Sequence, residues 1–478
     1  MVKRKRVEIA NATPAKGATP VKKAKPTSNS SASKQTSSGL PAEELTIQIV
    51  AGSYDRVLHG ITATIKPEGT VDFADTFLFT AHTSAIRAVA LSPFSAPVPG
   101  QGQKVLLASG STDERINLYN LSAHPPNRKN QELLSSVAPR PILENPKNRE
   151  LGTLLHHSSS ITKLVFPSRS KLLSSSEDST IAVTRTRDWS VLSTIKAPIA
   201  KPQGRPSGDT APFGGTPSGV NDFAIHPSMK LMISVSKGER CMRLWNLVTG
   251  KKAGVLNFSR EMLQEAGEGK HSSGEGRKVV WGKTEDEDEF AVGFDRDIVV
   301  FGMDSVPKCR VMPDTRTKIH DFSYVAIEGE TEASMLAVST EDGRVLFFST
   351  KTDDLNKPEK DKSLSTAKLI AQLGGKEAGV SGRIKTMAIL QANQALFVIG
   401  GSSDGKVRLW KVDTKELGTS NGNSKATTGG KLLGTYDTQN RITCLAAFAM
   451  IPRPEGVEES EDELEEDSEG DSEDEEEE

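Results

Sequence analysis

Ser403 lies in the segment Gly401-Ser-Ser403-Asp-Gly405, which matches the Gly-x-Ser-x-Gly pattern of hydrolase nucleophiles. In hydrolases, that serine occupies a turn between a strand and a helix and needs a histidine and an acid as partners. Here the same segment recurs along the chain as a strand–turn–strand unit. We therefore expect no catalytic residue and no enzymatic activity.

Other residue types that could do chemistry do not form a recognisable site. No Gly-x-x-x-x-Gly-Lys-Ser/Thr phosphate loop is present, so we expect no nucleotide cofactor. His156 and His157 are adjacent, and neighbours on a strand point to opposite faces, so we expect no metal site there. The acids at 285–289 are expected to form a solvated hairpin tip. The three cysteines are far apart in the sequence and are expected to be buried, reduced thiols.

One short pattern recurs seven times and indicates which elements position these residues. An acid is followed by an apolar residue three positions later and usually by a bulky residue six positions later, as in Asp113/Ile116/Tyr119 and Asp404/Val407/Trp410. The copies begin 47 to 65 residues apart. Their acids are Asp55, Asp113, Asp178, Glu239, Asp295, Asp342 and Asp404.

Each acid lies between two strand-like apolar runs, in a sequence suited to a tight hairpin turn. A third strand-like run precedes each pair, as at 86–93, and an outer strand follows each pair. These four strands together resemble the four-stranded WD repeat. The sequence thus predicts an all-β fold, a seven-bladed WD-repeat β-propeller at 45–454. Residues 45–80 lack an innermost strand, and 441–449 is a strand with no partners. We expect the last strand to complete the first blade, which would remove two open sheet edges.

The two ends of the chain have opposite charge. Residues 1–44 carry nine Lys or Arg and three Asp or Glu, whereas 455–478 carry seventeen acids and no base. Both segments have too few apolar residues to form a core, and we expect both to be disordered. The basic clusters indicate nuclear import, namely Lys3, Arg4, Lys5, Arg6, Lys22, Lys23 and Lys25. Three serines with an acid three residues later are candidate phosphosites, namely Ser460, Ser468 and Ser472.

The turns themselves suggest a role for their charged residues. We expect each acid to accept backbone N–H bonds and organise its turn, although the His–Ser/Thr–Asp–Trp network of strong WD repeats is incomplete here. Thr184 stands where Trp is usual, and Gly382 lies near the place of a histidine. Six turns also carry a base after the acid, which forms a candidate rim for RNA phosphates or an acidic partner, namely Arg56, Arg115, Arg240, Arg296, Arg344 and Lys406. The alternative is that bases are simply common in such turns.

Two stretches, 49–60 and 219–253, carry a more specific resemblance. The first contains Gly52-Ser-Tyr-Asp-Arg-Val-Leu-His-Gly60, and the second joins His226-Pro-Ser-Met-Lys-Leu231 to Arg243-Leu-Trp-Asn-Leu247. They resemble the p21-activated-kinase-interacting WD-repeat family, whose fungal members are known as maintenance-of-killer ribosome assembly factors. The long insertion before Gly219 and the acidic C-terminus depart from that family.

The resemblance implies a monomeric scaffold in the nucleus and nucleolus that assists assembly of the large (60S) ribosomal subunit. Its partners would be proteins of pre-ribosomal particles, or precursor ribosomal RNA, and no membrane. The alternative is a negative regulator that binds a p21-activated protein kinase. The basic N-terminal segment favours the nuclear role. The sequence leaves open which partner binds and which end of the propeller it uses.

Overall fold

The computed structural model describes residues 44–99, 101–126, 140–199, 218–269, 272–327, 333–357, 364–380, 382–414, 417 and 427–453. The basic clusters, the candidate phosphosites and the 201–217 insertion lie outside the described residues. No described helix is both long enough and apolar enough to cross a membrane.

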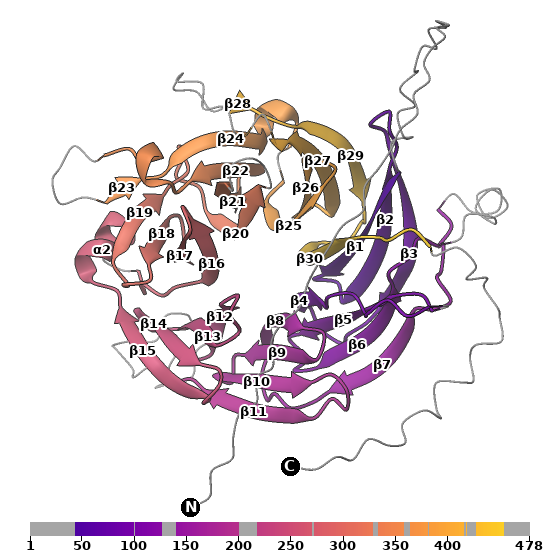
Figure 1. Ribbon diagram of the computed structural model, residues 1–478, viewed down its shortest axis with the longest axis horizontal. Coiled ribbons are helices and arrows are strands. Elements are labelled where there is room, and N and C mark those ends of the chain that lie inside the picture. The colour runs from indigo at the N-terminus through magenta and orange to yellow at the C-terminus, as the bar shows by residue number, and fades with distance from the viewer. Residues whose placement is uncertain are drawn as a thin grey trace, which may run out of the picture. The chain divides into compact units, whose positions relative to one another are not determined.

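Seven separate sheets, antiparallel except for one short added strand in each of two sheets, form a ring of blades (Figure 1). The fold is a seven-bladed β-propeller, as the repeats predicted. Blades 1 to 4, with strands from the centre outward, are as follows. Blade 1 contains β30 (Ile442–Ala449), β1 (Leu45–Ser53), β2 (Val57–Ile65) and β3 (Val71–Thr80). Blade 2 contains β4 (Ile86–Leu91), β5 (Lys104–Ser111), β6 (Ile116–Ser122) and β7 (Arg149–Leu154). Blade 3 contains β8 (Ile161–Ser168), β9 (Lys171–Ser176), β10 (Thr180–Arg185) and β11 (Val191–Lys196). Blade 4 contains β12 (Val220–Ile225), β13 (Leu231–Ser236), β14 (Cys241–Asn246) and β15 (Lys251–Asn257).

Blades 5 and 6 each gain a short fifth strand from the blade that follows. Blade 5 contains β16 (Lys278–Thr284), β17 (Glu287–Gly293), β18 (Ile298–Gly302), β19 (Pro307–Val311) and the added β23 (Ser365–Thr366). Blade 6 contains β20 (Ile319–Ile327), β21 (Ala333–Thr340), β22 (Arg344–Ser349), β24 (Lys368–Gly374) and the added β28 (Thr427–Thr428). Blade 7 contains β25 (Ile384–Ala392), β26 (Ala395–Ser402), β27 (Lys406–Asp413) and β29 (Lys431–Asp437). A short helix, α2 (Arg260–Glu265), lies between blades 4 and 5.

The core is divided among the gaps between blades. Each of seven apolar clusters in the described residues lies between two successive blades, such as the one that joins Val325 and Phe347 of blade 6 to Val398 and Trp410 of blade 7. Middle strands are therefore covered on both faces, and β5 is buried from its second residue to its last. Sheets covered on both faces favour continuous apolar runs rather than alternation. The outer strand β11 is mostly exposed.

The first and last described strands belong to one blade. β30 pairs with β1 along most of its length, with Val50 opposite Ala446 and Ala51 opposite Leu445. The innermost strands of all neighbouring blades are in contact, including β30 with β25 and with β4. The ring is therefore closed by hydrogen bonds between residues nearly 400 positions apart in the sequence.

Removal of β30 should prevent stable folding. Deletion of residues 438–478 exposes β1 and removes the buried side chains of Ile442, Leu445 and Phe448. Each such side chain contributes about 1.5–3 kcal/mol, and the sum approaches the roughly 5–15 kcal/mol of a typical domain. We expect aggregation at temperatures where the full chain is folded, measured by thermal melting and light scattering. Deletion of only 455–478 is the control and should leave the melting temperature unchanged. Equal melting of the two truncations would contradict this role for β30.

Candidate functional site

The seven acid turns lie at one end of the propeller, which we call the turn face. Each turn joins the second and third strands of its blade, and its backbone bonds to the residue just before the innermost strand. Examples are Thr112 N to Ala85 O, at 3.1 Å, and Ser403 N to Arg383 O, at 3.0 Å. Because this register repeats around the ring, the turns and the starts of the innermost strands surround one mouth of the central channel.

In blades 2 and 3, the acid belongs to a three-residue network. The His82 ring contacts Asp113 at 3.1 Å through Nδ1 and Ser109 at 2.8 Å through Nε2. The His157 ring contacts Asp178 at 3.0 Å and Ser174 at 2.8 Å in the same way. These networks tie the loop that enters a blade to the turn within it. In blade 3, the Thr184 hydroxyl, which occupies the place of the usual Trp, is buried with no hydrogen-bond partner among the described residues.

In blades 4 and 7, arginine replaces histidine as the partner of the acid. Arg408 lies on β27 and donates to Asp404, four residues earlier, at 2.9 Å. Arg243 forms the equivalent pair with Glu239. A Cβ added to Gly382 would lie 2.5 Å from Ser402 Oγ and 2.6 Å from the Asp404 carboxylate, so the entering loop has no room for a ring. Neither arginine was predicted from the sequence, although both stand in an Arg-Leu-Trp triplet.

The remaining three acids have other partners. Asp55 accepts from Arg441 N at 3.0 Å, which links its turn to the start of β30. Asp342 accepts from Arg344 Nε at 2.8 Å and from Thr315. Asp295 forms ion pairs with Arg277 and Lys318, both at 3.1 Å. All seven acids therefore contact groups of their own blade or the adjoining segment.

The six bases of the candidate rim do not share one environment. Those with exposed side chains are Arg56, Arg115, Arg240 and Arg296, while Lys406 is half-buried. Arg344 is ion-paired with Asp342 and only 14% of its side chain is exposed. Arg240 donates to the carbonyls of Ser272 and Ser273. The rim available to a partner therefore consists mainly of Arg56, Arg115 and Arg296.

The surroundings expected for two polar clusters were wrong. His156 and His157 do not point to opposite faces, because they precede β8 rather than lie on a strand, and both Nε2 atoms lie within 3.0 Å of Ser174 Oγ. Glu289 is not solvated: it is 2% exposed and contacts Thr284, Thr350, Tyr324 and Lys308. Only the start of that acidic run, at Glu285 and Asp286, forms the exposed turn.

Two further acids, missed by the sequence analysis, join successive blades. Asp222 on β12 forms an ion pair with Lys163 of blade 3 at 2.6 Å and accepts from Val279 N of blade 5 at 2.9 Å. Asp321 on β20 pairs with Lys278 of blade 5 and accepts from Met387 N of blade 7 at 3.0 Å. Both acids follow the first residues of an innermost strand, which is the only sequence signal for them.

The turn face carries no arrangement suited to hydrolysis. Ser403 lies in the turn between β26 and β27, so no helix follows it. Within the described ranges, no group of three or more His, Cys, Asp or Glu side chains could hold a metal. The three cysteines are free and buried.

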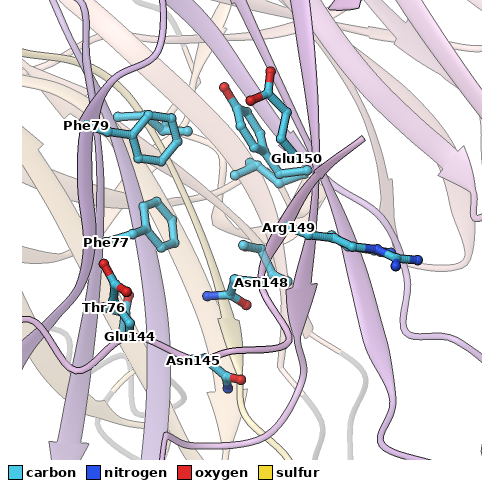
Figure 2. Close-up of a pocket in the computed structure, with 13 residues that line it drawn as sticks. Thr76, Phe77, Phe79, Glu144, Asn145, Asn148, Arg149 and Glu150 are labelled. Atoms are coloured by element: carbon cyan, nitrogen blue, oxygen red, sulfur yellow. The ribbon is translucent and has the colours of Figure 1, made fainter. Parts of the chain in front are cut away.

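A groove of about 340 Å³ lies between blades 1 and 2, away from the turns. Figure 2 shows Phe77 and Phe79 on one side of it and Asn148 and Glu150 on the other. Phe79 packs edge-on against Tyr119 with ring centroids 5.5 Å apart. No serine, cysteine or histidine is among the residues that line this groove, so it lacks the nucleophile and base of a hydrolase.

Comparison with known proteins finds distant relatives over most of the chain. The family model "WD domain, G-beta repeat" matches residues 148–183, which span β7 to β10. The chain is 26% identical to Protein MAK11 of Saccharomyces cerevisiae, over 83% of this chain and 82% of that protein. It is 24% identical to a p21-activated protein kinase-interacting protein 1-like of Danio rerio, over 84% of this chain and 80% of the relative. The corresponding protein of Xenopus laevis is 25% identical, over 87% and 85%.

The chain is a WD-repeat protein, and these relatives are its distant homologues. The matches cover most of the chain and of each relative, so they extend well beyond a single repeat. Propellers of the WD class are typically scaffolds without catalytic activity, which agrees with the structural role of the seven acids.

The Asp404–Arg408 pair should be energetically coupled. In Asp404→Ala, the guanidinium of Arg408, only 7% exposed, loses its partner, which should cost about 1.5–3 kcal/mol. In the double variant Asp404→Ala/Arg408→Met, that cation is absent, so the total cost should be smaller than the sum of the single costs by about 1 kcal/mol. Urea unfolding of the four proteins measures this coupling. Strict additivity would show that the pair does not organise the turn.

The blade 3 network should make stability depend on pH. Burial, and then repulsion from His157, lower the pKa of His156 to about 4. The unfolded chain binds this proton near pH 6.5, so the free energy of unfolding should decrease as pH falls from about 6.5 to about 4. Burial raises the pKa of Asp178, but hydrogen bonds from His157, Thr180 and Ser158 outweigh it and hold the pKa below the usual value. The contribution of Asp178 to the free energy of unfolding is therefore present above about pH 4 and is lost below it.

The substitution His156→Gln tests the histidine part of this dependence. Between pH 4 and 6.5, the slope of unfolding free energy against pH should become shallower, by an amount that corresponds to at most one bound proton. The exposed-site variant Lys251→Gln is the control. Identical slopes for His156→Gln and the unmodified protein would contradict the assignment.

Proposed function

We propose that the chain is a non-enzymatic scaffold that assists assembly of the large (60S) ribosomal subunit in the nucleolus. The observation that carries this proposal is the set of exposed arginines on the turn face, Arg56, Arg115 and Arg296. Cations at such positions attract RNA phosphates or acidic proteins, both of which surround a factor in a pre-ribosomal particle. None of these three arginines is required to organise its turn, because the acids have other partners.

Two further features support this role. The sequence resemblance to the maintenance-of-killer factors implies large-subunit assembly, and one of the relatives is Protein MAK11. The clusters at Lys3–Arg6 and Lys22–Lys25 suit nuclear import, which a factor in the nucleolus requires.

A second candidate function is negative regulation of a p21-activated protein kinase. The names of several relatives state that they interact with such a kinase. A propeller could perform this role by protein binding alone, with the same exposed surfaces. Nothing in that role requires the two basic clusters.

Depletion of the protein should separate these functions. A large-subunit factor predicts less free large subunit and half-mer polysomes on a sucrose gradient, with small subunits still formed. Re-expression of the unmodified chain should restore the profile. Arg56→Glu/Arg115→Glu/Arg296→Glu should restore it poorly, and should weaken co-sedimentation with pre-ribosomes because phosphate contacts are lost. Replacement of the bases in the two clusters by Gln should move a fluorescent fusion to the cytoplasm.

Lys251→Glu/Lys252→Glu on the exposed strand β15 is a matched charge control and should restore the profile fully. A normal gradient after depletion, accompanied by raised p21-activated kinase activity in the lysate, would reject the ribosomal role and favour the kinase regulator.

A further inference from the structure

The mouth of the central channel at the turn face is unevenly charged. The seven residues just before the innermost strands are equivalent: six accept a backbone N–H bond from the acid turn of their own blade, and Arg277 donates one to Gly293 O at the end of β17. Bases occupy this place in the consecutive blades 5, 6, 7 and 1, and small uncharged residues occupy it in blades 2, 3 and 4. The bases are Arg277, Lys318, Arg383 and Arg441, and the small residues are Ala85, Ser160 and Gly219.

A second layer of the mouth is formed by β-bulges. In six innermost strands, the residue after the first is skipped in the pairing register, and a bulge of this kind re-aims a side chain. The six bulge residues are Arg87, Thr162, Asn221, His320, Lys385 and Thr443. The cations of this layer are Arg87 of blade 2 and Lys385 of blade 7, and its histidine is His320 of blade 6.

The bulge residues differ in whether the fold uses their polar atoms. Thr443 donates to main-chain carbonyls at 3.0 Å or less, and Asn221 donates to Gly276 O at 2.9 Å. Within the described part of the chain, Lys385 has no hydrogen bond or ion pair, and the buried Nε2 of His320 has no partner. The fold therefore holds polar groups at the mouth that it does not itself satisfy, and such groups are costly unless a ligand or solvent satisfies them.

The cations are also crowded. Arg277 and Lys318 share a single carboxylate, that of Asp295. The Nε atom of Arg383 lies 3.4 Å from Glu341 Oε1. The guanidinium of Arg441 stacks on the ring of Tyr54. Burial, and then repulsion from Lys318, Arg383 and Arg441, lower the pKa of Lys385. Burial, and then repulsion from Lys385, Lys318 and Arg383, lower the pKa of His320 to about 4, so its ring is neutral at pH 7.

A cavity of about 520 Å³, lined by both polar and apolar residues, continues along the same strands. It is lined by residues of β20, β25 and β30 that follow the mouth residues, including Ala326, Ile389 and Ala447. Lys385 and Ile389 are four residues apart on β25, which is about 13 Å along a strand. The channel wall of blades 6, 7 and 1 thus changes from basic to apolar over the length of a short extended peptide.

We propose that this channel mouth binds a short acidic segment of a partner protein, with carboxylates at Arg383, Lys385 and Arg441 and an apolar side chain in the cavity. The proposal rests on the scaffold function above and names the site and the chemistry of its partner. An acidic peptide with an apolar side chain fits better than RNA, because the apolar side chains of the cavity, such as Ile389, offer nothing to a phosphate backbone. The last described residue is Arg453, whose side chain donates to Pro125 O. Pro125 follows the third strand of blade 2, so the described chain ends at the end of the propeller opposite the mouth.

Fluorescence anisotropy with the purified full-length chain tests the site. The probes are a labelled peptide of alternating Glu and Leu, a matched peptide of Glu and Ala, and a single-stranded oligouridine. We expect the Glu/Leu peptide to bind more tightly than the Glu/Ala peptide. Lys385→Glu/Arg441→Glu should weaken both peptides at least tenfold, and the effect should shrink at high salt. Lys251→Glu/Lys252→Glu should leave binding unchanged.

Ala326→Trp tests the cavity independently of charge. The added ring should fill the cavity and remove the advantage of Leu over Ala, while the salt dependence of binding remains. Unchanged melting temperatures would establish that each variant is folded. For any variant that fails to fold, Lys385→Gln alone replaces it and should give a smaller loss of affinity in the same direction.

Three results would overturn the proposal. The first is peptide binding that is insensitive to the mouth and cavity variants. The second is tight binding of oligouridine, but not of peptide, that depends on Lys385 and Arg441, which would identify a nucleic-acid site. The third is a gain in peptide affinity after deletion of 455–478, which would identify the acidic tail of the chain itself as the occupant.

This test is distinct from that of the proposed function. Normal gradients with intact peptide binding would reject the ribosomal role and retain the site. Abnormal gradients without specific peptide binding would reject the site alone.

Discussion

The structure depends on the pairing of β30 with β1. A propeller blade buries both faces against its neighbours, so it has no stable form outside a closed ring. The chain supplies the three outer strands of blade 1 at its beginning and the innermost strand only after six further blades. Every inter-blade cluster therefore depends on a contact between the two ends of the folded region. The pair of buried residues Ile49 and Leu445, which belong to the same apolar cluster, shows that closure also completes the core between blades 7 and 1.

The same requirement explains why polar groups are placed between blades as well as within them. Asp222 and Asp321 each accept a main-chain N–H from the next blade and an ammonium from the preceding one. A carboxylate in this position fixes the spacing and tilt of three blades at once, which apolar packing alone specifies less strictly. The turn acids mostly act over shorter distances, since their partners lie in the same blade or in the loop that enters it; Asp295 also reaches Lys318 at the start of the next blade.

The number of blades could be predicted from the sequence because the acid, the apolar residue and the tight turn must recur wherever a blade recurs. The partner of each acid could not be predicted, because it depends on the space left by another segment. Gly382 leaves Asp404 without a histidine, and Arg408 from the neighbouring strand takes that place. Glu289 was misjudged for a similar reason. Its neighbours in sequence are acidic, but Thr350 and Tyr324, which satisfy it, are more than 30 residues away in the chain.

Positions that are equivalent in the fold but differ in charge are the most informative about binding. Residues that the ring requires are satisfied within the ring, as Thr443 and Asn221 are at their bulges. Lys385 and His320 occupy the same structural place without such bonds, and the buried Nε2 atom of the half-exposed His320 is costly without a partner. Bases occupy only four of the seven equivalent positions, all in consecutive blades. Closure of the ring does not require them, because Ala85, Ser160 and Gly219 perform the same backbone role in the other three blades. The uneven mouth is therefore better explained by a ligand of opposite charge than by the stability of the propeller.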